Sequence, residues 1–311
     1  MSEPLDPRIH VDLAHLRALK GRARSITFRP RQPSNSILNG QHASKIKGRG
    51  LNFEELRHYA IGDDVRTIDW KVTARTGTPY VRVYTEERDR PVLLVVDQRM
   101  SMFFGSKLNM KSVTAAEAAA LSAFRVRAKG DRVGGIIFDD TGMTEIRPQS
   151  SARALNRFLD DLAQANCRLN AQAPSVRPIP LSQPIKAAAR IAKSGGLVIV
   201  FSDFDGWDDA TEKSLRRIAQ HNELILFSVS DPTSQQLPPD LNMIVSDGEL
   251  QAQVNVGDET VRRRLAEYSS GRLKSLFDFS GKYGVPVVPL TTAEETLPQL
   301  VRLLGGGGAR R

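Results

Sequence analysis

Two short apolar runs, each followed by an aspartate, constrain the fold of this chain more than any other feature. The runs are Val92–Val96, which leads directly into Asp97, and Leu197–Phe201, which leads through one serine into Asp203. Each run has the length of a β-strand and is apolar at every position, which is typical of a central parallel strand covered by helices on both faces. An acid at the carboxyl end of such a strand lies where open α/β sheets hold their ligands. We therefore predict a candidate site around Asp97.

The pattern after residue 90 predicts one large sheet domain. Helical segments alternate with apolar strand-like runs over residues 91–304, and this alternation favours a doubly wound, mostly parallel α/β sheet. Met110–Lys129 is the clearest helix, because apolar residues follow one of its faces and Gly130 supplies a stop signal.

The two ends of the chain differ from this domain. Residues 1–90 are more polar, with a short amphipathic helix predicted over Val11–Lys20, and we expect them to form a small lead-in to the sheet domain. Residues 305–311, GGGGARR, are predicted to be a disordered tail.

Composition limits the classes of protein that the chain fits. No apolar run is long enough to cross a bilayer, and the first residues lack the apolar stretch of a secretory signal. A single cysteine, Cys167, excludes an internal disulfide and fits a reducing compartment. We therefore expect a cytoplasmic protein without a membrane span.

The net charge of +9 raises the question of nucleic acid. The arginines alternate with acids, as in the segment Glu86–Arg90, and such alternation is more typical of ion-pair networks or a solvated face than of a surface that follows phosphates. A basic nucleic-acid-binding protein is therefore kept only as a minor alternative, which steeply salt-dependent binding would reveal.

The acids at the two strand ends need a compensating charge if the strands are neighbours. Carboxylates that share a crevice are stabilised by a hard cation with oxygen ligands or by an arginine. Ser101 is four residues past Asp97 and brings a hydroxyl into the same loop.

The loop Asp97–Ser101 resembles the Asp-x-Ser-x-Ser loop of the metal-dependent adhesion site in von Willebrand factor A-like domains, and Asp203 resembles the later strand-end aspartate of that site. The resemblance implies Asp97, Ser101 and Asp203 as ligands of Mg²⁺ or Mn²⁺. Arg99 departs from it, because a fixed positive charge stands where the first serine is expected. We therefore expect a degenerate site with weak or no metal binding, in which the Arg99 guanidinium takes the place of the cation and bridges the two acids.

Four charged segments before the first apolar run look like the signature of the bacterial family called Domain of Unknown Function 58. They are Gly48–Arg57, Gly62–Arg66, Ile68–Lys71 and Ala74–Gly77. The resemblance implies a von Willebrand factor A-like fold and a partnership with a MoxR-type AAA+ ATPase, beside which members of the family are typically encoded.

The signature itself has a structural and a functional interpretation. Its residues with expected structural roles are Gly62, Asp63, Asp64, Arg66, Asp69, Trp70 and Arg75. Gly62 suits a tight turn, and either aspartate after it could cap a following turn or pair with Arg66 and Arg75. Trp70 is expected in the core because large aromatic side chains are mostly buried. For Arg49 and Glu54, a structural role and a place on the partner surface are equally favoured.

Two functional hypotheses follow. The first is a non-enzymatic binding module that holds an ATPase or a client protein through the strand-end loops, with Arg99, Met100 and Asp205 in contact with the partner, and that helps the ATPase in protein assembly or maturation. The second is a metal-dependent hydrolase that uses Asp97, Asp203 and Asp205. No histidine or lysine falls plainly into the crevice as a proton-transfer group, which disfavours the hydrolase. The sequence leaves open whether the crevice or the signature contacts the ATPase.

Overall fold

The structure is a computed structural model that forms two compact units. It describes residues 6–26, 51–61, 63–86, 89–172, 178–234, 242–246, 251–255, 271 and 273–304. One unit, here called the sheet domain, comprises residues 1–30 and 90–311, and the other, here called the hairpin unit, comprises residues 31–89.

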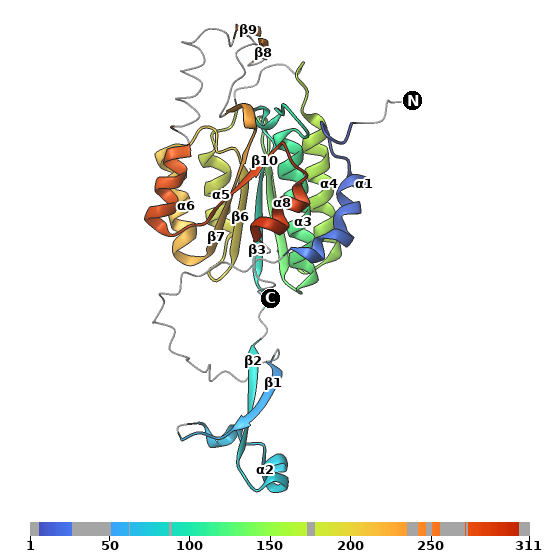
Figure 1. Cartoon of the computed structure of the whole chain (residues 1–311). Helices are drawn as coiled ribbons and strands as arrows, with labels where there is room; N and C mark the ends of the chain where they lie inside the picture. The colour runs from blue at the N-terminus through green and yellow to red at the C-terminus, as the bar shows by residue number, and fades with distance from the viewer. Residues whose placement is uncertain are drawn as a thin grey trace. The chain divides into compact units, whose positions relative to one another are not determined.

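The sheet domain is built on a six-stranded sheet with the order β10-β7-β6-β3-β4-β5 (Figure 1). Its strands are β3 (Pro91–Asp97), β4 (Arg132–Phe138), β5 (Met143–Gln149), β6 (Leu197–Ser202), β7 (Glu223–Ser230) and β10 (Val287–Thr291). All neighbouring pairs are parallel except β4 and β5, which are antiparallel. The predicted doubly wound, mostly parallel sheet is therefore confirmed.

Helices cover both faces of this sheet (Figure 1). The first face carries α1 (Leu13–Ala18), the 3-10 helix η1 (Leu19–Ser25), α3 (Lys111–Ala128), α4 (Ala152–Arg168) and α8 (Thr296–Leu304). The second face carries α5 (Ser182–Ile191), α6 (Asp209–His221) and the helical residues 273–283. Shorter elements are the 3-10 turns η3 (Met100–Met102) and η4 (Pro232–Ser234) and the antiparallel pair β8 (Asn242–Ser246) and β9 (Gln251–Asn255).

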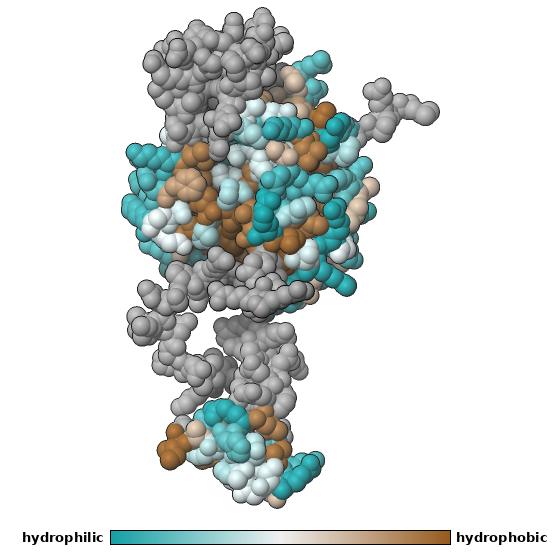
Figure 2. Space-filling model, viewed as in Figure 1, coloured by the Kyte–Doolittle hydropathy of each residue, from teal (hydrophilic) through white to brown (hydrophobic). Residues whose placement is uncertain are grey.

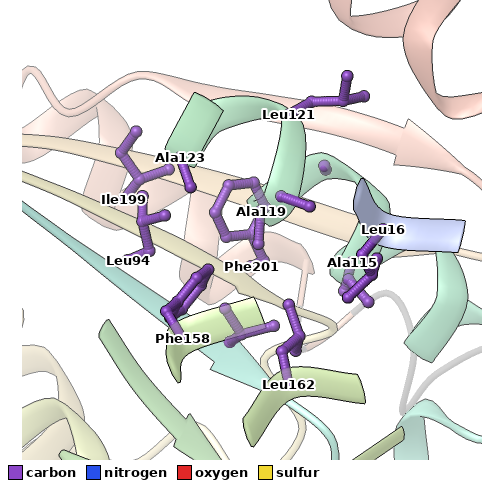
Figure 3. Packing of buried hydrophobic residues seen from close by; sticks show 14 of the residues in the cluster. Leu16, Leu94, Ala115, Ala119, Leu121, Ala123, Phe158, Leu162, Ile199 and Phe201 are labelled. Carbon is purple, nitrogen blue, oxygen red and sulfur yellow. The ribbon is translucent and has the colours of Figure 1, made fainter. Parts of the chain in front are cut away.

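The two central strands are apolar throughout because successive side chains enter different cores. Leu94 of β3 lies in the core on the side of α3, whereas Leu93 and Val95 lie in the core on the side of α5 and α6. Successive residues of a strand point to opposite faces, so a strand covered on both faces needs apolar residues at every position. Figure 3 shows the first core, where Phe201 of β6 lies close to Ala119 of α3.

Part of the predicted lead-in packs with the sheet domain. Leu16 of α1 is fully buried and lies beside Ala115 of α3 (Figure 3). The Nε2 of His15 in the same helix is hydrogen-bonded to Oε1 of Glu117 in α3, at 2.6 Å. The stretch that we expected as one lead-in over residues 1–90 is thus divided between the sheet domain and the hairpin unit.

The hairpin unit consists of two antiparallel strands and two short helical segments. They are β1 (Leu51–His58), η2 (Val65–Thr67), α2 (Trp70–Thr76) and β2 (Tyr80–Glu86). Asp69 caps the start of α2 by accepting hydrogen bonds from the backbone N–H groups of Lys71 and Val72, at 3.0 and 3.2 Å. Gly77 ends the helix with φ +77°, a left-handed conformation that glycine adopts without strain.

None of the helices in the described part of the chain has both the length and the apolar character needed to cross a bilayer.

Candidate functional site

The candidate site lies at the point where the sheet changes its winding direction. From β3 the chain proceeds to β4 and β5 on one side, and it then returns to place β6 on the other side of β3. Asp97 is the last residue of β3, and Asp203 follows the last residue of β6. Because β3 and β6 are adjacent parallel strands, both acids lie at the same carboxyl edge. Open α/β sheets bind their ligands at such a switch point.

Asp97 is held by a dense set of hydrogen bonds. The Nε of Arg99 donates to its Oδ1 at 3.0 Å, and the Nη2 of Arg99 donates to its Oδ2 at 2.7 Å, which gives a forked contact. The backbone N–H of Arg99 and the hydroxyl of Ser202 add bonds of 3.0 and 2.6 Å. The side chains of Asp97 and Arg99 are 0% and 4% exposed, so this is a buried ion pair with most of its hydrogen-bonding capacity used.

Asp203 is paired with Lys111, whereas we expected Arg99 to bridge Asp97 and Asp203. The Nζ of Lys111, at the start of α3, donates to its Oδ2 at 2.6 Å. The backbone N–H of Asp205 donates to Oδ1 at 3.0 Å, and the Ser101 hydroxyl is within 3.4 Å of the same oxygen. The side chain of Asp203 is 1% exposed and that of Lys111 is 11% exposed, so this pair is also buried.

The four charges at the strand ends therefore balance inside the protein. Burial alone would lower the pKa of the Arg99 guanidinium, but the nearby carboxylates of Asp97, Asp203 and Asp205 raise it above its ordinary value. Arg99 is thus a permanent cation. It also donates from Nη2 to the backbone carbonyl of Asp205 at 3.0 Å, which ties the loop after β3 to the loop after β6.

The donor set of this site does not fit a divalent cation. A hard cation needs several oxygen ligands whose negative charge is free to neutralise it. Here the carboxylates of Asp97 and Asp203 are each engaged by a buried side-chain cation, and a metal ion beside Arg99 and Lys111 would be repelled by both. Among the described residues there is also no group of three or more His, Cys, Asp or Glu side chains arranged to hold a metal.

Three participants in the site were not predicted from the sequence. Lys111 carries the second cation, Ser202 bonds to Asp97, and Asp140 accepts a 2.7 Å hydrogen bond from the backbone N–H of Met100. Burial raises the pKa of the Asp140 carboxyl above its ordinary value, although the bond from Met100 and the charge of Arg99 oppose the rise. The expectation that no lysine lies in the crevice is therefore wrong. Lys111 is the second residue of the predicted helix Met110–Lys129, and the position of that helix directly after the loop of Asp97 was the available signal.

A buried network of side-chain amides holds the loop after β3 in place. The Nε2 of Gln98 donates to the carbonyl of Ser112 at 3.1 Å, and its Oε1 accepts from Asn166 of α4 at 2.9 Å. The Oδ1 of Asn166 in turn accepts a 2.8 Å bond from the backbone N–H of Val11. Gln98 and Asn166 are fully buried, so the residue between Asp97 and Arg99 is fixed to both α4 and the N-terminal segment.

The signature acids have local structural roles in the hairpin unit. Asp63 forms a forked ion pair with Arg57, with distances of 2.6 and 2.7 Å, and Asp64 caps η2 by accepting from the backbone N–H of Arg66 at 3.0 Å. The guanidinium of Arg57 lowers the pKa of Asp63. The capping that we expected is found, whereas neither acid pairs with the side chain of Arg66 or Arg75.

The prediction that Trp70 lies in the core is wrong. Trp70 is the first residue of α2 and is 68% exposed, while Asp69 beside it is buried as the helix cap. A capping side chain lies close to the start of the helix, and this position buries Asp69. The residues of α2 itself, including Trp70, are not buried. Arg49 and Gly62 lie outside the described residues, and Glu54 is described only as part of the backbone of β1.

Comparison with known proteins identifies relatives of this chain. The family model described as a protein of unknown function, DUF58, matches residues 55–273, which is well over half of the chain. Uncharacterised proteins of Mycobacterium bovis and Mycobacterium tuberculosis are 29% identical over 286 residues, which cover 90% of this chain and 87% of theirs.

Among solved structures, the Deinococcus radiodurans RO (RSR) protein matches with a TM-score of 0.28 and 16% sequence identity. The match covers 59% of this chain and 35% of that one, and a score at this level carries no inference.

Proposed function

This chain belongs to the family of proteins of unknown function DUF58, and from that starting point we propose that it is a non-enzymatic protein-binding module. Its strand-end edge is a degenerate form of the metal-dependent adhesion site of von Willebrand factor A-like domains. The edge holds a partner protein through the loops Asp97–Ser101 and Asp203–Asp205. Arg99, Met100 and Asp205 are the residues proposed to define this contact.

The observation that carries the proposal is the internal charge balance of the site. Catalysis by a metal-dependent hydrolase needs carboxylates that bind a cation and a group that moves a proton. Asp97 is held by Arg99, and Asp203 is held by Lys111, so the two acids that would serve a hydrolase are engaged in buried ion pairs. A rigid, charge-balanced edge at a topological switch point suits recognition better than turnover.

The partner proposed for this edge is a MoxR-type AAA+ ATPase, which would act with this chain in the assembly or maturation of a client protein. Support comes from the resemblance of the charged signature to a family whose members are typically encoded beside such ATPases.

The test is a pull-down with the tagged full-length chain in Mg²⁺-ATP, read by mass spectrometry. The native chain should capture a MoxR-type ATPase, and Met100→Glu should lose most of the capture, because a new charge is introduced at the edge without removing either ion pair. Asp209→Ala, which changes an exposed acid at the start of α6, is the matched control and should retain capture.

A second variant separates binding from folding. Asp203→Ala leaves Lys111 as an uncompensated buried charge, so it must be compared with Asp203→Leu combined with Lys111→Met, which removes both charges together. Capture that is lost in the double variant, at an unchanged melting temperature, supports the adaptor role. Capture that is unchanged in Met100→Glu and in the double variant contradicts it. Mg²⁺-dependent hydrolysis that Asp203→Ala abolishes would establish the hydrolase instead.

A further inference from the structure

The hairpin unit exposes several large apolar side chains, and few of its described side chains are buried. Among its described side chains, Val81 is the one apolar group that is fully buried, whereas Trp70 is 68% exposed and Ile61 and Val65 are more than half exposed. In the view of Figure 2, apolar and hydrophilic residues lie side by side on the surface of this unit. A two-stranded hairpin with one short helix gains little stability by itself, and exposed apolar groups on such a unit are typical of an interaction surface.

Helix α2 combines the exposed tryptophan with two cations. Lys71 and Arg75 are one helical turn apart, both are exposed, and neither forms an ion pair with a described residue. Lys71 lies in the first turn, where the helix dipole disfavours a positive charge, so helix stability does not explain its presence. Two nearby acids have other roles within the unit, because Asp69 caps the helix and Asp63 pairs with Arg57 of β1.

We propose that α2 is a docking surface for an acidic patch on another protein, with Trp70 inserted into an apolar pocket of that partner and Lys71 and Arg75 paired with its carboxylates. Tryptophan and arginine are the residues that most often dominate the binding energy of protein interfaces. The other exposed large apolar side chains described in this unit, Leu56, Ile61 and Val65, are aliphatic, and the rings of His58 and Tyr80 contact each other. Surfaces for single-stranded nucleic acid instead present several aromatic rings for stacking. An acidic protein surface therefore fits the α2 surface better than RNA or DNA.

The α2 surface and the strand-end edge consist of different residues, which belong to different units of the chain. The inference does not rest on the function proposed for that edge. The test places photoreactive p-benzoyl-phenylalanine at position 70 of the full-length chain in its native cells. Irradiation should give a cross-link to a different protein, and the cross-linked peptide should lie in an acidic segment. The substitution is made at an exposed position, so the fold should be retained, which an unchanged melting temperature checks.

Charge reversal decides whether the cross-link reports the proposed contact. Lys71→Glu with Arg75→Glu should reduce the cross-link at least tenfold. The matched control is Lys213→Glu with Arg217→Glu, two exposed positions of α6 that are also four residues apart. It changes the net charge of the chain by the same amount and should change the cross-link yield less than twofold.

Several outcomes overturn the inference. They are the absence of any cross-link, a cross-link that ribonuclease or deoxyribonuclease removes, a cross-link to a second copy of this chain, and a yield that falls equally in both charge-reversal variants. Met100→Glu, which keeps both buried ion pairs of the strand-end edge, should leave the cross-link intact, so failure of the strand-end proposal and failure of this one are distinguishable. A cross-link to an acidic protein other than an ATPase would support this surface, and the pull-down described above would still decide the partner of the strand-end edge.

Discussion

Asp97 and Asp203 each have a side-chain cation as an immediate neighbour, and this pairing determines how the strand-end edge responds to substitution. Both ion pairs are buried, so removing one partner leaves an uncompensated charge that typically costs about 3–5 kcal/mol. Arg99→Ser alone is therefore expected to destabilise the sheet domain. It also leaves Lys111 on Asp203, so it is not expected to create a metal site.

The combination of Arg99→Ser with Lys111→Ala is expected to bind a divalent cation. The double variant frees both carboxylates and adds a hydroxyl at the place of the first serine in the Asp-x-Ser-x-Ser loop. Oxygen sites with so few ligands bind divalent cations with a Kd on the order of millimolar. Calorimetric titration with Mn²⁺ should detect binding in the double variant and none in the native chain, and Mn²⁺ should raise the melting temperature of the double variant only. A double variant that gives no heat and no shift would show that the acids do not converge as described.

A third buried carboxylate, Asp231, organises the same edge of the sheet. Asp231, directly after β7, accepts hydrogen bonds from the backbone and hydroxyl of Ser106 at 2.8 and 2.6 Å, from both groups of Thr233, and from the hydroxyl of Thr292. Burial opposes ionisation, but these donors together lower its pKa from 3.8 to about 2. The loops after β3, β7 and β10 are thus fixed to one another through Asp231.

Asp231 predicts a specific response to acid. A lowered pKa contributes stability that is fully present above pH 3.8 and is lost as the pH falls through about 2, and a shift of this size corresponds to roughly 2 kcal/mol. Urea unfolding at a series of pH values should show this loss for the native chain. Asp231→Asn should be less stable at pH 7 and should lose less stability between pH 4 and pH 2. Asp209→Asn, at an exposed helix start, should behave as the native chain does.

The pairing of individual residues was the part of the site that the sequence could not supply. The positions of Asp97 and Asp203 follow from strand patterning, which is local information. Lys111 is 92 residues from Asp203 in the chain, and only the packing of α3 against the sheet brings the two together. The exposure of Trp70 was missed for a similar reason, because the size of a side chain predicts burial only where a core exists to receive it.

At the level of secondary structure, α1 is attached to the sheet domain by a titratable contact. The hydrogen bond that the His15 ring donates to the carboxylate of Glu117 raises the pKa of His15 above its ordinary value of 6.5, although partial burial opposes the rise. The second oxygen of Glu117 accepts a bond from the hydroxyl of Thr296 in α8, so three helices meet at this carboxylate.

A raised histidine pKa gives a pH dependence of known sign. The contribution of the His15–Glu117 pair is fully present below pH 6.5 and is lost as the pH rises through the folded pKa of His15. Hydrogen exchange of residues 13–25 should therefore become less protected, relative to β3, as the pH is raised from 6 to 8 after correction for intrinsic rates. In His15→Gln that relative protection should not depend on pH, and a dependence that survives the substitution would assign it to another group.

The helices and strands of the sheet domain were predicted well because their patterns are complete within each segment. The apolar runs of β3 and β6 indicate burial on both faces, and the predicted helix Met110–Lys129 corresponds to α3 at Lys111–Ala128. The association of α1 with α3 was not predicted, because the apolar stripe of a short helix indicates that it packs but not against which element.

At the level of the whole molecule, the two units differ in how much apolar surface they bury. The sheet domain has two extensive cores, one on each face of its sheet, whereas the hairpin unit has few buried apolar groups among its described residues. Stability in proteins comes mainly from such burial, so local opening of the hairpin unit requires less free energy than opening of the sheet.

Native-state hydrogen exchange is the measurement that checks this difference. The amides of β1 and β2 should exchange at least tenfold faster than those of β3 and β6, after correction for intrinsic rates, and increasing urea should accelerate the first group at lower concentrations. Equal protection in both units would mean that the hairpin unit is stabilised by contacts beyond those described for it.

The internal pairing of Asp97 with Arg99 and of Asp203 with Lys111 has a consequence for control of the molecule in the cell. A binding surface that depends on a bound metal ion is active only when that ion is available, and it loses its affinity when a chelator removes the ion. A surface whose counter-ions are covalently part of the chain has no such switch. Under the proposed function, the ability of this edge to bind is set when the chain folds, so the timing of binding would come from the partner, through its abundance or its own cycle of states.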